Sequence, residues 1–332
     1  MASIFKHGNK WRAQVRIKGK SASKLFNNKR EAQRWARDKE IQFEQAIIHG
    51  APPKKTFGDA MRRYAEEVTP HKRSWKKEQQ YLLRMAENDP LAAIPLSALG
   101  PRHFADWRDR RLRQVKPASV LREWSMLSAV CKKCVTDWEW LPFNPLQNVQ
   151  RPKEESPRTR RVEGDELERI VFATGYDPDL PPEKILQRVG AAALFAVETA
   201  MRTGEIVNMT WCDVDFEKRT VHIPISKNGS ARDVPLSRRA MHILKQLKPL
   251  PQCQKRCFGM NNRQLDANYR KARSMAMVEG LRFHDLRREA LTRLAQKVDV
   301  MTLAKISGHR DLRILQNVYY APDMGDVASK LD

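Results

Sequence analysis

The nine residues from Val189 to Val197, Val-Gly-Ala-Ala-Ala-Leu-Phe-Ala-Val, are apolar on nearly every side of a helix. A helix at a protein surface needs a polar face, so a helix without one has to be enclosed by other elements. The run is also far shorter than the ~20 apolar residues that cross a bilayer. It therefore predicts a buried core helix, which the chain leaves through Met201-Arg-Thr-Gly-Glu205.

Two polar, proline-bearing segments interrupt the chain. Residues 50–55 read Gly-Ala-Pro-Pro-Lys-Lys, and residues 151–158 read Arg-Pro-Lys-Glu-Glu-Ser-Pro-Arg. Such segments are typical of linkers, and 332 residues suit two or three domains better than a single core. We expect domains at residues 1–50, 54–150 and 158–332, the last with a C-terminal tail.

The first region has the pattern of a small sheet and one helix. Lys10–Ile17 alternates in the manner of a strand, Gly19-Lys20 makes a turn, and residues 21–26 can pair back. Asn27-Asn28 then caps a helix over Lys29–Ile48. A short basic sheet with one helix suits a DNA groove, and a generic surface extension is the alternative.

The other two regions are predicted to be mainly helical. In the second region, helices are predicted at Phe57–Val68 (capped by Thr56), at Arg73–Glu87, after Gly100-Pro101, and at Pro117–Trp138. In the third, they are predicted at Gly164–Thr174, Pro182–Met201, Ser237–Leu247, Asn262–Val278, His284–Lys297 and Val300–Ser307. Thr220–Ser226 and Arg232–Pro235 read as a hairpin around Lys227-Asn-Gly. The predicted fold class is multidomain and mainly α with small β-sheets: a sheet-plus-helix module, a helical domain and a mixed α+β domain.

Basic residues exceed acidic ones throughout the chain. The totals are 62 Lys and Arg against 39 Asp and Glu, and the three predicted domains with their linkers carry net charges of +8, +7 and +8. An excess without a single basic tail favours a polyanion bound along the length of the chain. Basic helix faces are often merely solvated, but here several share the bias. Candidate DNA-binding residues are Lys10, Arg12, Arg16, Lys72, Lys76, Lys77, Arg110 and Arg113.

Other classes of protein fit the sequence poorly. The N-terminus has no apolar signal core, so we expect a cytoplasmic protein without a membrane partner. The five cysteines are an odd number, which argues against a disulfide framework. A zinc site split between Cys131-Lys-Lys-Cys134 and Cys253 with Cys257 lacks the usual histidine pair. We therefore expect ordinary thiols, no metal and no cofactor.

Two arginines stand where a phosphate could be held. Arg202 follows the core helix, and Glu205, one helical turn on, could orient its planar guanidinium group. His284 and Arg287 are spaced i, i+3, so they share one face at the start of a helix, where anions are attracted. Each motif alone is also compatible with an ion pair or a capping histidine. Together they suggest a phosphate clamp.

Further residues could supply the reactive groups. Lys227 at the hairpin tip could reach a leaving oxygen, and His309 follows Ser307-Gly308. A tyrosine, with an ordinary pKa near ~10, becomes a competent nucleophile where cations stabilise its phenolate. Tyr319 and Tyr320 are the candidates.

The order Arg, Lys, His-x-x-Arg, His, Tyr resembles that of the tyrosine recombinase (phage integrase) family. The stretches around Arg202 and Lys227, the box Phe283-His-Asp-Leu-Arg-Arg288, and Trp138-Glu-Trp-Leu-Pro are similar to family motifs. The resemblance covers about residues 56–332, while residues 1–50 resemble integrase arm-binding modules less specifically.

The resemblance implies a fold and a reaction. The three regions would be an arm-type DNA-binding module, a helical, SAM-like core-binding domain and a catalytic domain. Arg202, Arg287 and His309 would hold the scissile phosphate, and Lys227 would protonate the 5′-hydroxyl leaving group. His284 would assist proton transfer, and a tyrosine would form a 3′-phosphotyrosine without metal or ATP. Four protomers would act on two duplexes through a Holliday junction, with accessory DNA-bending or directionality proteins as possible partners.

The tyrosine spacing departs from the family pattern. The family usually places its tyrosine nine residues after the histidine, where this chain has Val318. The tail from Tyr319 to Leu331 favours Tyr319 with a one-residue insertion, and Tyr320 is the alternative. A type IB topoisomerase and a catalytically silent DNA-binding regulator are the alternative functions.

Overall fold

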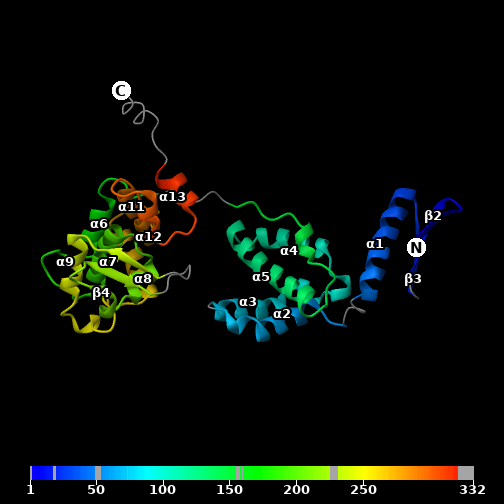
Figure 1. The fold of residues 1–332 in the computed structure, drawn as a ribbon, viewed down its shortest axis with the longest axis horizontal. Coiled ribbons are helices and arrows are strands. Elements are labelled where there is room, and N and C mark those ends of the chain that lie inside the picture. Colours follow the sequence, from blue (N-terminus) through cyan, green and yellow to red (C-terminus); the bar gives the residue numbers. More distant parts are fainter. Residues whose placement is uncertain are drawn as a thin grey trace, which may run out of the picture. The chain divides into compact units, whose positions relative to one another are not determined.

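Helices dominate the computed structural model, which describes residues 2–17, 20–48, 54–72, 74–154, 158, 160–224 and 231–320 (Figure 1). The chain divides into two compact units, residues 1–157 and 158–332. Among the described residues, two small antiparallel sheets accompany the helices, one in each unit. The predicted fold class, mainly α with small β-sheets, is confirmed.

The N-terminal sheet has the order β1-β2-β3 and carries one helix. Its elements are β1 (Ala2–His7), β2 (Lys10–Ile17), β3 (Lys20–Phe26) and α1 (Lys29–Ile48). Ala32 and Ala36 of α1 pack on Ala13 and Val15 of β2. The sequence predicted β2, β3 and α1 but missed β1, which joins β2 through a two-residue turn that begins at Gly8, with φ of 61°.

Four helices build a second core in the first unit. They are α2 (Phe57–Glu67), α3 (Trp75–Asn88), α4 (Pro101–Leu112) and α5 (Pro117–Thr136). Thr56 and Asp59 form a capping box at the start of α2, and Phe57 meets Phe104 edge-on, with 5.4 Å between ring centroids. Cys131 and Cys134 lie in this core, so their side chains serve packing. The four predicted helices are confirmed.

The second unit is built around α7. Its helices are α6 (Glu166–Ala173), α7 (Ile185–Thr199), α8 (Thr203–Asn208), α9 (Arg238–Leu247), α10 (Asn262–Met275), α11 (Phe283–Ala295), α12 (Val300–Ser307) and α13 (Leu312–Tyr319). Helices α6, α9, α10 and α11 all contact α7, and every residue from Val189 to Val197 is buried. The prediction of an enclosed core helix is confirmed.

The ends of α7 differ from the predicted range Pro182–Met201. The helix begins at Ile185 because Lys184 is extended and its main-chain N–H donates to Gln187 Oε1 at 2.9 Å. It ends at Thr199 because Ala200 adopts a left-handed conformation, with φ of 53°. A C-terminal residue in that conformation turns the chain out of the helix.

The second sheet consists of β4 (Val214–Asp215), β5 (Thr220–Ile223) and β6 (Arg232–Pro235), in that order. The sequence predicted the hairpin β5–β6 but missed the two-residue strand β4. Short 3₁₀ turns lie at Thr69–His71, Pro90–Ala93, Leu96–Ala98, Pro145–Asn148, Trp211–Asp213 and Pro251–Cys253.

Candidate active site

Arg202 is placed by the turn that ends α7. Ala200 redirects the chain, and Arg202 lies extended at the start of α8. Its Nη1 donates to Glu205 Oε1 at 2.9 Å, and its main-chain N–H donates to Oε2 at 2.8 Å. Glu205 thus holds both the backbone and the guanidinium group of Arg202.

Arg232 on β6 is a part of this cluster that sequence reasoning missed. It is 8% exposed, and its two terminal nitrogens donate to Glu205 at 3.0 and 2.6 Å. Burial alone would raise the pKa of Glu205, but the hydrogen bonds from Arg232 and Arg202 hold it below its ordinary value. The carboxylate therefore stays ionised between the two guanidinium groups.

Arg287 on α11 is buried, with 5% of its surface exposed. This excludes the surface arginine that the bare spacing also allowed. Its Nη2 donates to Ser307 O at 2.7 Å, and its Nη1 donates to Ala200 O. Burial and the nearby charge of Arg202 lower its pKa to about 10, so it remains a cation at neutral pH.

All three arginines donate hydrogen bonds to carbonyl oxygens at the C-terminal end of α12. Arg232 Nε donates to Ile306 O at 2.8 Å, Arg287 to Ser307 O, and Arg202 Nη2 to Gly308 O at 3.4 Å. Carbonyl groups at a helix C-terminus lack intrahelical partners and carry partial negative charge. Three successive carbonyl oxygens therefore assemble cations that come from distant parts of the sequence.

His309 follows directly and is neutral in this environment. Burial, and then the charges of Arg287, Arg202 and Arg232, lower its pKa to about 4. Its Nδ1 lies 2.7 Å from Ser307 Oγ, which itself donates to Leu303 O at 2.6 Å. Because a hydroxyl has one proton to give, neutral His309 donates from Nδ1 and leaves Nε2 as an acceptor.

A pocket of about 380 Å³ opens beside these groups. It is lined by Arg158, Arg282, His284, Asp285, Arg287, Arg288, Leu291, His309 and Tyr319. His284 lies in the first turn of α11 and Tyr319 at the end of α13. Of the predicted site, His284, Arg287, His309 and Tyr319 line this pocket. Arg202 donates to Gly308 O at the end of α12, and Glu205 pairs with Arg202. Lys227 lies outside the described residues.

Tyr319 and Tyr320 have different surroundings. Tyr319 lines the pocket, and its ring centroid is 6.0 Å from the guanidinium carbon of Arg288. Burial raises the pKa of Tyr319, against the opposing charges of Arg288 and Arg287. The hydroxyl of Tyr320 instead donates to Val298 O at 2.5 Å. Tyr319 is therefore the tyrosine that faces the cations.

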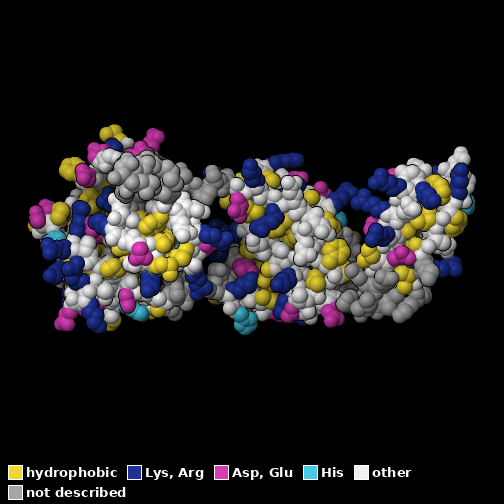
Figure 2. Space-filling view, turned by 45° about the horizontal axis from the view of Figure 1, so that its top comes forward, with side chains coloured by type: hydrophobic (Ala, Val, Ile, Leu, Met, Phe, Trp, Pro, Cys, Tyr) yellow, Lys and Arg dark blue, Asp and Glu magenta, His cyan; other side chains and the backbone are white. Residues whose placement is uncertain are grey.

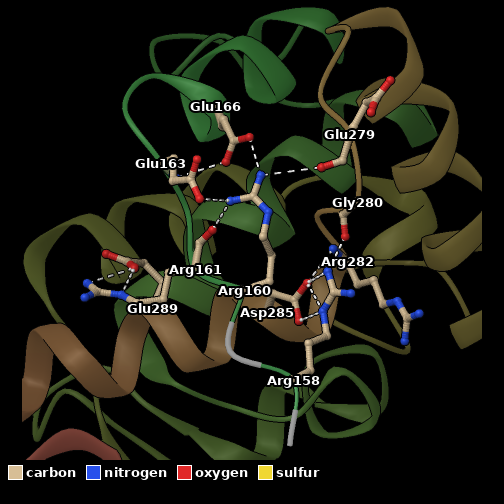
Figure 3. A network of polar contacts seen from close by, with 10 residues as sticks. All are labelled: Arg158, Arg160, Arg161, Glu163, Glu166, Glu279, Gly280, Arg282, Asp285 and Glu289. Carbon is tan, nitrogen blue, oxygen red and sulfur yellow. Dashed lines mark hydrogen bonds and ion pairs between the residues drawn. The ribbon is translucent and has the colours of Figure 1, made fainter. Parts of the chain in front are cut away.

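We call residues 158 and 160–166 the strap; two of its arginines, Arg158 and Arg161, pair with acidic residues of α11 (Figure 3). Arg158 pairs with Asp285 and Arg161 with Glu289, both on α11. Arg160 pairs with Glu163 and Glu166. Arg158 also lines the pocket, and sequence reasoning missed it because its partner lies 127 residues away.

The candidate DNA-binding residues differ in how they are held. Lys10, Arg12 and Arg16 occupy alternate positions of β2, on the face opposite Ala13 and Val15. Lys76, Lys77 and Arg113 are exposed, whereas Lys72 pairs with Glu78 and Arg110 with Asp89. Figure 2 shows Lys and Arg side chains scattered over the face that it draws, among hydrophobic and other side chains.

The described residues contain neither a membrane-spanning helix nor a cluster of metal-ligating side chains. None of their helices has the length and apolar character that a bilayer crossing requires. Within the same ranges, no three His, Cys, Asp or Glu side chains gather as metal ligands.

Known proteins are similar to this chain in sequence and in fold. Residues 160–325 match the model of the phage integrase family. A putative integrase/recombinase of Haemophilus influenzae is 48% identical over 98% of this chain and 89% of its own length. A shufflon-specific DNA recombinase of Escherichia coli is 31% identical over 84% of this chain and 72% of its own.

A solved structure of a lambda integrase tetramer bound to a Holliday junction has the same fold. It superposes with a TM-score of 0.64 at 16% identity, over 95% of this chain and 94% of that one. The chain therefore belongs to the phage integrase family of tyrosine recombinases.

Proposed function

We propose that this recombinase cleaves and rejoins DNA strands through a 3′-phosphotyrosine intermediate, with Tyr319 as the nucleophile. The observation that carries the proposal is the pocket that contains Tyr319, Arg287, His284 and His309. Cations around a tyrosine stabilise both its phenolate and the charge that develops on the phosphoryl group. Such a site needs no metal or ATP for the strand exchange.

In the cleavage step, Tyr319 Oη attacks the scissile phosphorus and displaces the 5′ oxygen of the next nucleotide. One phosphorus–oxygen bond forms as another breaks, so the bond energy is kept for rejoining. Arg202 and Arg287 hold the non-bridging oxygens, and Glu205 and Arg232 keep Arg202 in place. Lys227 gives a proton to the leaving 5′ oxygen, and His284 takes the proton of the tyrosine.

His309 contributes to phosphate binding through a change of protonation. Its pKa is about 4 in the protein without DNA, and a phosphate beside it favours the charged form. We infer that His309 gains a proton at Nε2 when the scissile phosphate binds, and then donates to a phosphate oxygen.

The N-terminal module and the helical domain would grip DNA outside the cleavage site. On the open face of the sheet, Arg12 pairs across strands with Phe5 and Leu25, which are 42% and 47% exposed. A major groove admits such a ribbon of strands, and basic residues on it would meet the phosphates. We propose that residues 1–50 bind arm-type sites, residues 54–150 core-type sites, and residues 158–332 the scissile phosphate.

The assembly would be a tetramer on two duplexes, as in the lambda integrase complex with a Holliday junction. Exchange would pass through that junction in the cytoplasm of a prokaryotic cell, with accessory DNA-bending or directionality proteins as possible partners.

A nicked suicide substrate that spans the attachment site tests the proposal. Wild type and Tyr320→Phe should form a covalent protein–DNA adduct, and Tyr319→Phe should form none. An adduct that survives in Tyr319→Phe but is lost in Tyr320→Phe would reverse the tyrosine assignment. A wild type that binds this DNA without any adduct would identify a DNA-binding regulator. Relaxation of supercoiled DNA without site preference would identify a topoisomerase.

A further inference from the structure

The strap is fastened to the turn of α11 that carries His284 and Arg287. Arg158 Nε donates to Asp285 Oδ1 at 3.1 Å, its Nη2 donates to Oδ2 at 3.0 Å, and it also donates to Gly280 O (Figure 3). Asp285 is buried and accepts from the main-chain N–H of Arg282 at 2.8 Å. Arg158 is therefore held on two sides, beside the pocket.

Arg288 connects this anchored residue to the tyrosine. Its Nη1 donates to the main-chain oxygen of Arg158. On its other side, the guanidinium carbon lies 6.0 Å from the centroid of the Tyr319 ring. A guanidinium group at that distance from an aromatic face attracts the ring. The contacts thus run from Asp285 through Arg158 and Arg288 to Tyr319.

Arg288 differs in its contacts from its neighbour Arg287. Arg287 is directed to the carbonyl oxygens of Ala200 and Ser307, within the arginine cluster at the end of α12. The contacts of Arg288 are with the strap and with Tyr319. Two consecutive arginines of one helix therefore serve two different parts of the site.

Tyr319 ends the short helix α13, which is anchored by little buried surface. Of the eight residues of α13, Leu315 is the fully buried one. The hydroxyl of Tyr320 donates a hydrogen bond to Val298 O, which holds the C-terminal end of α13 in place. The orientation of the Tyr319 ring then depends on the groups that contact it, and Arg288 is one of them.

Resting on the proposed phosphotyrosine chemistry, we infer that Arg288 is a positioning residue for Tyr319, which it holds in attacking geometry from its own anchor on the strap. A small displacement of a nucleophile slows attack strongly, because the reacting atoms must be aligned. The charge of Arg288 also opposes the rise in the pKa of Tyr319 that burial causes.

Two reactions separate this role from a role in phosphate binding. Cleavage of the nicked suicide substrate needs the tyrosine. Joining of a 5′-hydroxyl strand to a strand that ends in a 3′-p-nitrophenyl phosphate does not need the tyrosine, but it does need the residues that bind the phosphate, such as Arg202 and Arg287. In the joining reaction the 5′-hydroxyl attacks phosphorus, its proton passes to Lys227 in reverse of the proposed cleavage step, and p-nitrophenolate leaves. Because the tyrosine takes no part, this reaction is measured in a Tyr319→Phe background.

Arg288→Ala should slow cleavage on the order of 100-fold and leave DNA binding and the joining rate near those of its parent. Arg288→Lys keeps a cation without the planar guanidinium group, so its cleavage rate should lie between those of wild type and Arg288→Ala. Arg293→Ala is the matched control, since Arg293 lies on the same helix and pairs with Glu289 at 2.9 Å. It should cleave at the rate of the wild type.

The possible failures are distinguishable. If wild type forms no adduct, the proposed function fails and this inference fails with it. If wild type cleaves normally and Arg288→Ala loses cleavage and joining equally, Arg288 acts on the phosphate or the fold, and the positioning role is refuted. Unchanged cleavage by Arg288→Ala refutes it as well.

Discussion

Arg287 donates a hydrogen bond to the main-chain oxygen of Ala200, although 87 residues separate them. Ala200 ends the core helix α7, and Arg287 belongs to α11, which packs on that helix. The left-handed turn at Ala200 both directs Arg202 toward the cluster and presents an oxygen to Arg287. The core helix and the arginine cluster are thus joined at one residue.

Replacement of Arg287 should affect folding as well as reactivity. Arg287→Ala leaves the oxygens of Ala200 and Ser307 without this donor, and each buried unpaired group costs about 1–3 kcal/mol. We expect the free energy of unfolding, measured in urea, to fall by on the order of 3 kcal/mol. Arg287→Lys should recover part of the stability but not strand cleavage, because one ammonium group does not span both oxygens. Unchanged stability of Arg287→Ala would show that these hydrogen bonds contribute nothing net.

Arg232 and Glu205 should behave as a coupled pair. Arg232→Met removes one partner of a buried ion pair, which costs about 3–5 kcal/mol where the remaining charge has no compensation. Arg202 still compensates Glu205 in part, so we expect the lower end of that range. Arg232→Met with Glu205→Gln should be more stable than the sum of the two single changes predicts. Additive effects in this double-mutant cycle would argue against the coupling.

Stability should depend on pH through His309. The pKa of His309 is about 4 in the folded protein, against an ordinary value of 6.5 that we take for the unfolded chain. Between these values the unfolded chain binds more protons, so stability decreases as the pH falls through this window, by up to about 1.4 kcal/mol per pH unit. His309→Gln should lose that part of the slope. Curves of equal slope for both proteins between pH 4 and 6.5 would contradict the depressed pKa.

The two tyrosines should differ in stability as well as in chemistry. Tyr320→Phe removes the hydrogen bond to Val298 O and should lower the free energy of unfolding by about 1 kcal/mol. Tyr319→Phe should leave it nearly unchanged. Thermal unfolding of the two variants side by side measures the difference. If Tyr319→Phe were the less stable variant, the hydroxyl of Tyr319 and not that of Tyr320 would make the stabilising hydrogen bond.

The open face of the N-terminal sheet should contribute to the salt dependence of DNA binding. Replacement of Lys10, Arg12 and Arg16 by Gln should reduce the slope of log affinity against log salt by roughly one for each phosphate that the variant no longer neutralises. Lys24→Gln is the control, because Lys24 lies opposite Ala13, on the face that carries α1. An unchanged slope in the triple variant would exclude this face from the interface.

Local patterns were enough to predict much of this molecule. The run from Val189 to Val197 predicted the enclosed helix α7, because a helix without a polar face is stable only where other elements bury it on all sides. Capping residues set the start of several helices, as Thr56 does for α2. Strand β1 was missed because its inner face consists of little more than Ala2 and Ile4.

The contacts within the site were less accessible from sequence. Arg232 reads as an ordinary strand residue, and only the fold brings it to Glu205 and Ile306. Arg158 lies in a segment that composition identified as a linker. Such partners lie far apart in sequence, and no local period or spacing encodes them.

The three clustered guanidinium groups have a thermodynamic consequence. Glu205 pairs with Arg202 and Arg232, while carbonyl dipoles hold Arg287 without cancelling its charge. The protein without DNA thus keeps like charges packed together, a repulsion that lowers its own stability. A phosphate that enters the cluster removes this repulsion, so part of the affinity for DNA is relief of strain already present in the free fold. Loss of Arg287 still destabilises the fold, because its two hydrogen bonds to Ala200 O and Ser307 O contribute more than the repulsion costs.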